Sequence, residues 1–538
     1  MTTAPTAPTT SGLSHRQILS ILSGLLLGMF LASLDQTIVS TAMRTIADKL
    51  HGQTAQAWVT TAYLVTSTVS TPLYGKLSDL YGRKPFYLFA IGTFLVGSVL
   101  CGQAHSIYEL AAYRAVQGLG AGGLLSLAFA IVGDLVAPRE RAKYQAYFTS
   151  VFATSSVLGP VAGGFFAGQD QILGIDGWRW IFYINLPLGA LAFWVVLRKL
   201  KLPRHRLPRR IDYLGAALMI ATVVPLLLVA EKGREWGWGS ATSLGMIGLA
   251  VLAFVLFIPR ERAMGEDAIL PLRVFSNRVF SVTSVVSFLV GMVMFGGLAL
   301  MPLYLQIVKQ ETPTKAGLQM IAFMAGLMGS SLVIGRVMQR TGRYKIFPIV
   351  GTAIMFVGVL LFSTMTIDTP ISTVMTYMVV MGVGLGLTMQ MLVIAVQNAL
   401  PPQDMGLSTS SVTFFRSMGA TLGAAVSLGV LFGTVRANIA DRVAGGHLAL
   451  SDLGTLQKLS LQDTTSFAQL TAPARRVVLS GFADSMHTVF LVVAAVVVPA
   501  FIGTFFIKEV PLRSEGGLAA QRTGDGDGER AMAETAVV

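Results

Sequence analysis

The chain is poor in charge and nearly free of cysteine. Asp, Glu, Lys and Arg make up 12% of its 538 residues, about half the share found in a typical soluble protein. A set of water-soluble domains is excluded by this composition. The one cysteine, Cys101, excludes an internal disulfide and a thiolate metal cluster. Because it lies within an apolar stretch, we interpret it as a small buried side chain.

Sequence patterns for nucleotide-driven work and for catalysis are also missing. The chain has no GxxxxGK[ST] segment, which argues against direct drive by ATP. It has no His/Cys cluster with metal-ligand spacing and no Ser, His and Asp arrangement of a hydrolase. The sequence therefore predicts a protein that is not an enzyme, with no catalytic residues, no metal and no cofactor.

Long apolar stretches dominate the sequence. Hydrophobic residues account for 53% of the chain, and stretches of about 18 or more residues with almost no charge recur along it, each long enough to cross a bilayer. We predict an all-α integral membrane protein with fourteen transmembrane helices. They are expected at 17–43, 55–74, 86–103, 107–133, 144–168, 180–198, 211–231, 241–259, 278–308, 314–338, 346–366, 371–397, 408–435 and 486–507.

The basic residues lie mainly in the short segments between these stretches. The formal net charge is +13, which we attribute to anchoring at the membrane surface rather than to nucleic-acid binding. With the N-terminus inside, the inner segments hold 26 Lys and Arg and the outer segments hold 12. This bias predicts a multi-pass protein of the inner (plasma) membrane, in contact with its lipids, with both termini in the cytoplasm.

A sequence repeat divides the chain. The segment GKLSDLYGRKPF from Gly75 returns as GRVMQRTGRYKIF from Gly335, and Gly118, Gly120 and Gly122 have counterparts in Gly382, Gly384 and Gly386. Two parallel six-helix units with two inserted helices explain both repeats, and such halves enclose a binding site at the membrane midplane. The predicted segments are a disordered tail at 1–15, a first bundle at 16–199, linker helices at 200–270, a second bundle at 271–510 with an outer loop at 437–485, and a disordered tail at 511–538.

Several segments together resemble one transporter family. GKLSDLYGRK (75–84) resembles the signature loop of the major facilitator superfamily. Seven further segments resemble the fourteen-helix drug:proton antiporters of the EmrB/QacA type. They are LDQTIVSTAM (34–43), YRAVQGLGAG (113–122), LGPVAGG (158–164), WRWIFYINLP (178–187), PLRVFSNRVF (271–280), PLYLQ (302–306) and FFRSMGATLG (414–423). The resemblance covers about residues 16 to 513. It implies a proton-coupled antiporter that exports amphipathic, often cationic drugs or toxic small molecules by alternating access, with the proton gradient as its energy source.

Other functions remain open at this point. Export of an endogenous lipid, siderophore or antibiotic fits the same residues. An uptake symporter and a non-transporting membrane sensor are alternatives of another class. Transport into everted vesicles would separate these three.

We predict that the signature loop acts as a conformational latch that holds the cytoplasmic side closed. Its residues are Gly75, Asp79, Gly82, Arg83 and Lys84. Gly75 permits close helix approach, Gly82 permits a tight turn, and Asp79 can accept charge-assisted hydrogen bonds from Arg83 or from amides at a helix end. The alternative is a merely solvated basic loop. In the second copy Gln339 replaces the carboxylate, so we expect a weaker latch there.

The segment LGPVAGG is typical of exporters in the family it resembles. Pro160 removes one backbone hydrogen bond from its helix, and Gly159, Gly163 and Gly164 offer a smooth face for a neighbouring helix. Simple helix packing explains the glycines equally well. The family has a further glycine where this chain has Ser155.

Two charges lie deep inside apolar stretches, Asp35 and Arg114. Each would cost several kcal/mol if left unpaired in lipid, about 2.5–3.5 kcal/mol at a helix centre. Counting residues from the outer helix ends places them at similar depth. We predict one shared polar site in which the carboxylate alternates between a proton and a cationic substrate. A static buried ion pair is the alternative.

The remaining polar candidates carry less weight. Four other charged residues are expected to stabilise helix ends or helix packing rather than to take part in transport: Arg416, Asp212, Glu231 and Asp134. The predicted substrate cavity takes its polar residues from Gln36, Gln117, Gln306 and Gln390, with Tyr63 and Met389 as aromatic and apolar neighbours. The outer loop 437–485 could cover the gate or dock a periplasmic partner; a partly ordered connection is the simpler interpretation.

Overall fold

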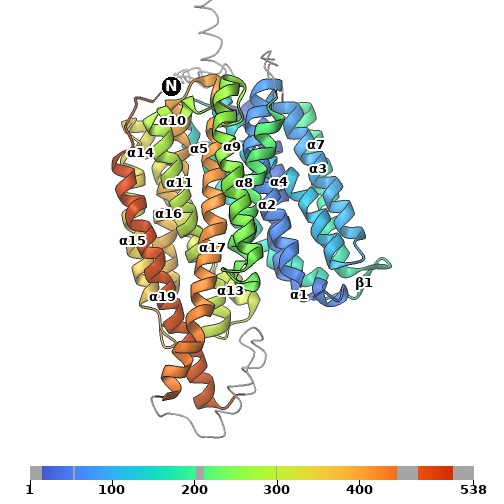
Figure 1. Ribbon diagram of the computed structural model, residues 1–538, viewed down its shortest axis with the longest axis vertical. Coiled ribbons are helices and arrows are strands. Elements are labelled where there is room, and N and C mark those ends of the chain that lie inside the picture. Colours follow the sequence, from blue (N-terminus) through green and yellow to red (C-terminus); the bar gives the residue numbers. More distant parts are fainter. Residues whose placement is uncertain (1–14, 53–54, 201–210, 299, 445–469, 513–538) are drawn as a thin grey trace, which may run out of the picture.

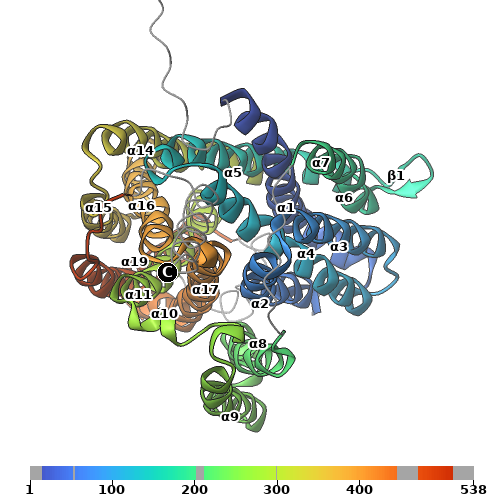
Figure 2. The same ribbon diagram turned by 90° about the horizontal axis from the view of Figure 1, so that it is seen from above.

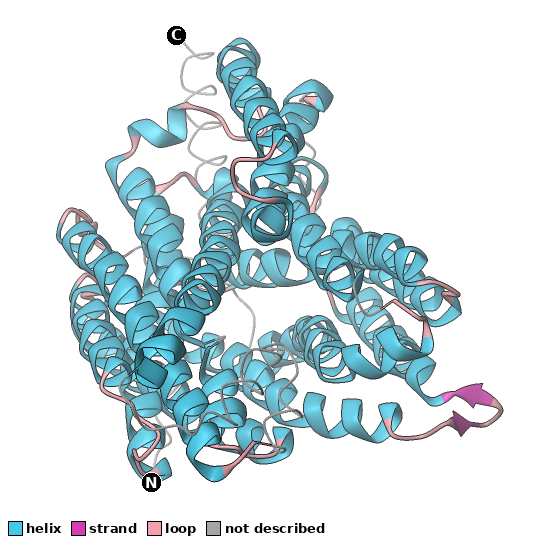
Figure 3. Cartoon of the chain, turned by 60° about the horizontal axis from the view of Figure 1, so that its bottom comes forward, coloured by secondary structure: helices cyan, strands magenta, loops and turns pink. Residues whose placement is uncertain are grey.

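The computed structural model describes residues 15–52, 55–200, 211–298, 300–444 and 470–512. Nearly all of the predicted tails, 1–15 and 511–538, therefore lie outside the described residues. Figure 3 shows a helical molecule in which a small hairpin at the periphery holds the strands of the described chain.

The first bundle is formed by the N-terminal third of the chain. Its long helices are α1 (His15–Lys49), α2 (Gln56–Tyr81), α3 (Arg83–Gln103), α4 (Ile107–Leu135) and α5 (Pro138–Ala167). After the antiparallel hairpin of β1 (Gln171–Ile172) and β2 (Ile175–Asp176) come η2 (Gly177–Arg179), α6 (Trp180–Tyr183) and α7 (Asn185–Lys199). The sixth predicted helix is thus formed by α6 and α7 with Ile184 between them.

Two linker helices follow, α8 (Tyr213–Trp236) and α9 (Ala241–Met264), with η3 (Gly265–Asp267) and α10 (Arg273–Ser276) leading on. Viewed along the helices, α8 and α9 stand outside the two bundles (Figure 2). α8 packs on α2 of the first bundle and on a helix of the second, whereas α9 packs mainly on α8. The linker therefore braces the junction between the halves.

The second bundle repeats the plan of the first. It comprises α11 (Arg278–Leu298), α12 (Leu300–Leu303), the π-helix η4 (Tyr304–Val308), α13 (Pro313–Gln319), α14 (Ile321–Thr341), α15 (Ile346–Ser363), α16 (Ile371–Ala399), η5 (Pro402–Asp404), α17 (Met405–Ala444) and α19 (Ala472–Phe505). Figure 1 shows both bundles with their helices roughly parallel along the long axis.

The repeated glycines occupy equivalent crossings in the two bundles. Gly118 and Gly122 of α4 lie against the backbone of α2, while Gly120 faces α3. In the second bundle Gly382 and Gly386 of α16 lie against α14, and Gly384 faces α15. A side chain at any of these positions would collide with a neighbouring helix, so the small residues set the helix spacing.

Thirteen helical segments of the described chain are long and apolar enough to span a membrane. The second predicted helix, at 55–74, forms as α2 but is rich in Ser and Thr, and it is not among these thirteen. It packs against α4, α8 and α17. A helix that is surrounded by protein can carry polar residues that lipid would disfavour.

The outer loop is shorter than predicted at 437–485. α17 continues to Ala444 and α19 already begins at Ala472, and both extensions project at the bottom of Figure 1. Asn438 donates to Ser485 at 2.8 Å, and Arg442 pairs with Asp484 at 2.5 Å. Hydropathy missed these turns because paired polar residues stabilise a helix beyond the apolar span. The remainder of the loop, 445–469, lies outside the described residues.

Candidate functional site

Asp35 and Arg114 form an ion pair inside the first bundle. Arg114 Nη1 lies 2.5 Å from Asp35 Oδ2 and joins the middle of α1 to α4. Both side chains are buried, with 0% and 1% of the residue surface exposed. The structure therefore brings together the two deep charges that the sequence singled out, and each offsets the cost of burying the other.

Three further polar side chains complete a closed network around the carboxylate. Gln117 Nε2 and Asn185 Nδ2 donate to Asp35 Oδ1 at 2.8 and 2.7 Å. The same two amides donate to Ser98 Oγ at 2.7 and 3.2 Å. Helices α1, α3, α4 and α7 thus meet at one group. The sequence analysis missed Asn185 and Ser98, although Asn185 is conspicuous as a lone amide in the apolar stretch 180–198.

The network is sealed by apolar and aromatic groups. The guanidinium of Arg114 lies 4.0 Å from the ring centre of Tyr63, a cation–π contact. Cys101 Sγ lies 3.7 Å from Gln117 Oε1. Since Asp35, Gln117, Asn185 and Ser98 are all fully buried, Asp35 can exchange a proton only after the surrounding helices separate.

The predicted cavity residues have mixed positions. Gln117 and Tyr63 were expected to face the cavity but are buried within the first bundle as part of the network. Their helices, α4 and α2, are enclosed by other helices, so polarity does not mark a cavity face. Gln36 and Met389 are half-buried, and Gln306, in the π-helical turn, is exposed. Gln390 joins the halves, because it donates to Thr149 of α5 and to Ser331 of α14, both at 3.2 Å.

The segment at 158–164 packs α5 against α1 beside the ion pair. A side chain at Gly159 would strike Thr37, and one at Gly163 would meet the backbone of Ile38. Thr37 also donates to the Ser155 carbonyl at 3.1 Å. Gly164 has open space around it and does not share in this close contact, contrary to the prediction. Pro160 approaches Gly317 of α13, in the other half.

The signature loop joins the two halves at one end of the molecule, which we call the latch end. Asp79 accepts hydrogen bonds from the amides of Gly406 at 3.0 Å and Leu407 at 2.8 Å. Those amides belong to the first turn of α17, which carries the positive end of the helix dipole. The sequence predicted that Asp79 accepts from helix-end amides, and the structure supplies them from the second bundle.

Arg83 holds Asp79 in place from the other side. It pairs with Asp79 at 2.5 Å and with Asp134, at the end of α4, at 2.7 Å. Gly82 has a φ of 98°, which favours glycine. Gly75 lies so close to Ser410 and Gly406 that any side chain would collide with them. Lys84, in contrast, donates to the Leu197 carbonyl of α7 at 2.7 Å, a contact within the first bundle.

A further contact between the halves at the latch end was not predicted. Arg141 of α5 is 1% exposed and donates to Gln397 Oε1 of α16 at 2.7 Å. Its other nitrogens donate to the carbonyls of Gly133 and Val136 at 2.6 and 2.8 Å. Gln397 in turn donates to Thr409 of α17 at 2.7 Å. Together with Asp79, Arg141 keeps the two halves closed at the latch end.

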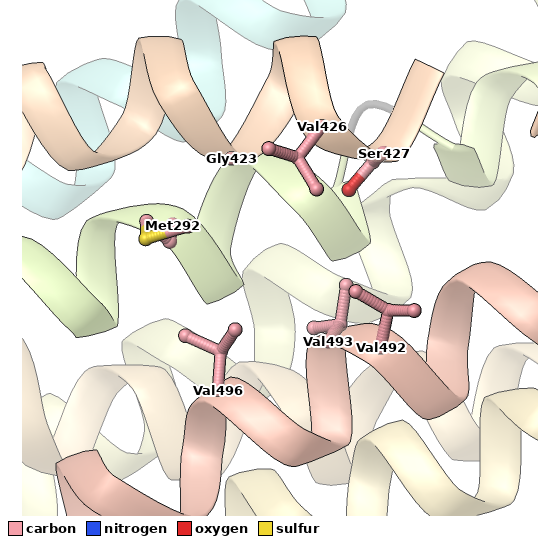
Figure 4. Close-up of a pocket in the computed structure, with 7 residues that line it drawn as sticks. All are labelled: Met292, Gly423, Val426, Ser427, Val492, Val493 and Val496. Atoms are coloured by element: carbon pink, nitrogen blue, oxygen red, sulfur yellow. The ribbon is translucent and has the colours of Figure 1, made fainter. Parts of the chain in front are cut away.

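One small pocket lies elsewhere, among α11, α17 and α19 of the second bundle (Figure 4). Its walls are Met292, Gly423, Val426, Ser427, Val492, Val493 and Val496. No charged side chain lines it, so it has no part in the ion-pair network or the latch.

The sequence matches the model of the Major Facilitator Superfamily over residues 25–424. This chain belongs to the major facilitator superfamily. It is a multi-pass membrane transporter and not an enzyme, and the predicted fold class of two six-helix bundles with inserted linker helices is confirmed.

Known relatives span nearly the whole chain. An MFS-type transporter of Mycobacterium tuberculosis (strain ATCC 25618 / H37Rv), Rv1877, is 37% identical over 95% of this chain and 73% of its own length. The multidrug transporter protein MdtP of Bacillus subtilis (strain 168) is 32% identical over 92% of this chain and 94% of its own. Among solved structures, the proton:xylose symporter XylE aligns with a TM-score of 0.59 at 14% identity, covering 95% of this chain and 100% of that one. The last similarity concerns the fold alone.

Proposed function

We propose that this chain is a proton-coupled antiporter that exports amphipathic, often cationic small molecules from the cell. Relatives named multidrug transporter or efflux pump support export. The observation that carries the proton coupling is the buried Asp35, held by Arg114 in a bundle that must open before the carboxylate meets solvent. The proton gradient is the energy source, with no further cofactor.

The coupling follows from competition at one carboxylate. A substrate cation that arrives from the cytoplasm favours ionised Asp35 and expels its proton inward. A proton from outside neutralises Asp35 and releases the substrate outward. Arg114 favours the ionised form and burial favours the neutral form, so helix movements that change hydration or the pair distance alter proton affinity.

The charge bias of 26 inner to 12 outer basic residues supports a plasma-membrane orientation with both termini and the latch end in the cytoplasm. The conformation described above is then closed to the cytoplasm. Export of an endogenous lipid, siderophore or antibiotic would use the same machinery with another substrate, and a periplasmic partner could dock on the outer loop.

The decisive measurement is substrate-induced proton release by purified, reconstituted protein. Asp35→Asn should abolish it and abolish gradient-driven export of cations. Arg114→Ala should also cripple export because it leaves a buried carboxylate unpaired, and Arg114→Lys should rescue it only in part, since lysine lacks the planar fork. If Asp35→Asn still releases protons as the parent does, the carrier lies elsewhere and the ion pair is static.

Everted vesicles separate the alternatives. An inside-acid gradient should drive a cationic dye into them if the chain is an exporter. An uptake symporter would move its substrate in the opposite direction under the same gradient. A membrane sensor would give no flux.

A further inference from the structure

Two carboxylates meet in the buried joint between the linker helices. Asp212 caps the start of α8 and Glu261 lies near the end of α9, and each is 1% exposed. Asp212 Oδ2 and Glu261 Oε1 both lie where a side chain on Gly215 would stand, so the two oxygens face the same small space. Gly215 is required there because any larger residue would push the carboxylates apart.

The other oxygen of each carboxylate is fully engaged. Asp212 Oδ1 accepts from the Gly215 amide at 2.9 Å and from Arg260 Nε at 2.9 Å. Glu261 Oε2 accepts from the Leu270 amide at 3.0 Å. The two oxygens beside Gly215, Asp212 Oδ2 and Glu261 Oε1, have no hydrogen-bond donor among the described residues.

If both buried carboxylates were ionised, their negative charges would repel each other. Each would also keep one buried oxygen without a hydrogen-bond donor, which is energetically unfavourable. A single proton removes both problems. Glu261, which has no directly paired cation among the described side chains, becomes a neutral acid and donates to Asp212 Oδ2. Arg260 pairs with Asp212 at 2.8 Å and supplies the positive charge next to that carboxylate.

The charged groups around the pair come from several elements. Arg260 of α9 pairs with Asp212, and the positive charge of Lys76, in the signature loop at the end of α2, attracts the carboxylate of Glu261. Lys76 is itself engaged, since its Nζ donates to the Glu266 carbonyl of η3 at 2.6 Å. Farther along, Arg273 of α10 pairs with Asp404 at 2.9 Å and lies 3.9 Å from the Glu266 carboxylate.

These contacts connect the carboxylate pair to the latch. Glu261 fixes the chain at Leu270, Glu266 holds Lys76 next to Gly75, and Asp404 lies directly before the α17 amides that bind Asp79. Repulsion between Asp212 and Glu261 would loosen the chain that runs from η3 to α10. It would thereby weaken the contact of Glu266 with Lys76 and the contact of Arg273 with Asp404. The pair is therefore placed to make closure at the latch end depend on a proton.

We propose that Asp212 and Glu261 form a second proton-binding site, distinct from Asp35, in which one proton taken from water at the latch end is held between Asp212 Oδ2 and Glu261 Oε1. The site stabilises the closed latch when it is protonated. Loss of the proton returns it to water and leaves two facing negative charges that loosen the linker joint. The proposal depends on the linker geometry alone, so it stands or fails separately from antiport through Asp35.

Infrared spectroscopy of the reconstituted full-length protein tests the proposal directly. The parent should show the carbonyl stretch of one protonated carboxyl group that disappears as the pH is raised, and Glu261→Gln should lack that band. The substitution should fold, since the glutamine oxygen can accept from the Leu270 amide while its NH₂ group donates to Asp212. Asp170→Asn is the control, because its side chain is 96% exposed near Lys49 and lies away from the linker joint.

A second variant keeps the test decisive. Asp212→Asn removes the charged acceptor and should shift the band or abolish it. An identical spectrum in the parent and Glu261→Gln, or an unshifted band in Asp212→Asn, would overturn the proposal. The same outcomes hold whether or not Asp35→Asn abolishes proton release, so failure of the proposed antiport is recognised separately.

The link to the latch has its own readout. In the parent with Cys101→Ser, the maleimide rate of a cysteine at Met405, which is 2% exposed at the closed interface, is divided by the rate of a cysteine at the exposed Leu173. This ratio removes the rise in thiolate with pH that every cysteine shows, and it should increase as the pH rises. Glu261→Gln should remove this pH dependence, because its amide mimics the protonated state, and Asp170→Asn should retain it. An unchanged pH dependence in Glu261→Gln would show that closure does not follow the pair.

Discussion

Replacing Asp79 with Asn should weaken the closed state with almost no change in side-chain volume. The native carboxylate accepts two amides of the first turn of α17, at 3.0 and 2.8 Å, one on each oxygen, and pairs with Arg83. An asparagine has only one acceptor oxygen, so one of the two amides loses its acceptor. The negative charge that faces the start of α17 is lost as well.

The magnitude can be worked from these contacts. A hydrogen bond to a charged group contributes about 1.5–3 kcal/mol, and a charge at a helix N-terminus about 0.3–1 kcal/mol. Arg83 keeps Asp134 as a partner at 2.7 Å, which limits the loss. We expect the closed state to lose about 3 kcal/mol, which corresponds to a roughly 100-fold shift in population at ~1.4 kcal/mol per factor of ten.

Labelling of a buried cysteine measures this shift. With Cys101→Ser and Met405→Cys as background, the maleimide reaction rate follows the open fraction, because Met405 is 2% exposed against Gly133. Asp79→Asn should raise the rate about 100-fold in line with the population shift and should slow transport. Asp170→Asn, whose side chain is 96% exposed near Lys49, should change neither. An unchanged rate in a correctly inserted Asp79→Asn protein would refute the latch and favour a solvated loop.

Four further outcomes follow from the contacts. Gly75→Val should push α2 from α17 and raise the Met405→Cys labelling rate, because its side chain would overlap Ser410. Arg141→Gln should raise the same rate, by roughly tenfold if it removes one charged hydrogen bond of about 1.5 kcal/mol across the halves. Gly159→Leu should destabilise the packing of α1 on α5 by about 1–3 kcal/mol and lower export, whereas Gly164→Ala should have little effect. In the Cys101→Ser background, an impermeant maleimide added outside cells should label a cysteine at Ala472 and spare one at Gln403, and the reverse pattern would contradict the orientation.

How far the sequence predicts the site depends on the kind of residue. Asp35 and Arg114 were recognisable because a charge in an apolar stretch is costly and therefore rare. Ser98 was not, since small polar residues are common in membrane helices. Asn185 stands out as a lone amide in its apolar stretch, but its link to Asp35 depends on how α7 is rotated. α4 is apolar on nearly all faces, so the orientation of Gln117 could not be inferred from a polar stripe.

The latch shows the same division. The motif at 75–84 identified Asp79 and Arg83, but the acceptor site consists of backbone amides at Gly406 and Leu407, more than three hundred residues away. Every helix start offers such amides, so no side chain marks the one that Asp79 binds. Arg141 and Gln397 escaped notice for a related reason, because a basic residue near an inner helix end is expected to anchor the helix at the membrane surface.

Helix α4 connects the two parts of the proposed mechanism. It carries Arg114 and Gln117 at the buried network and Asp134 at the latch, with about 20 residues, or ~30 Å of helix, between them. A small rotation of α4 that separates Arg114 from Asp35 also moves Asp134 away from Arg83, and Arg83 is the residue that positions Asp79 on α17. In the proposed antiport, protonation of Asp35 would remove the charge that fixes α4 at one end, so loading the proton would lower the cost of moving the other end. In this arrangement a rigid helix, rather than a chain of flexible contacts, links proton binding to the opening of the latch, and Asp134→Asn should uncouple the two by freeing Arg83 while leaving proton release at Asp35 intact.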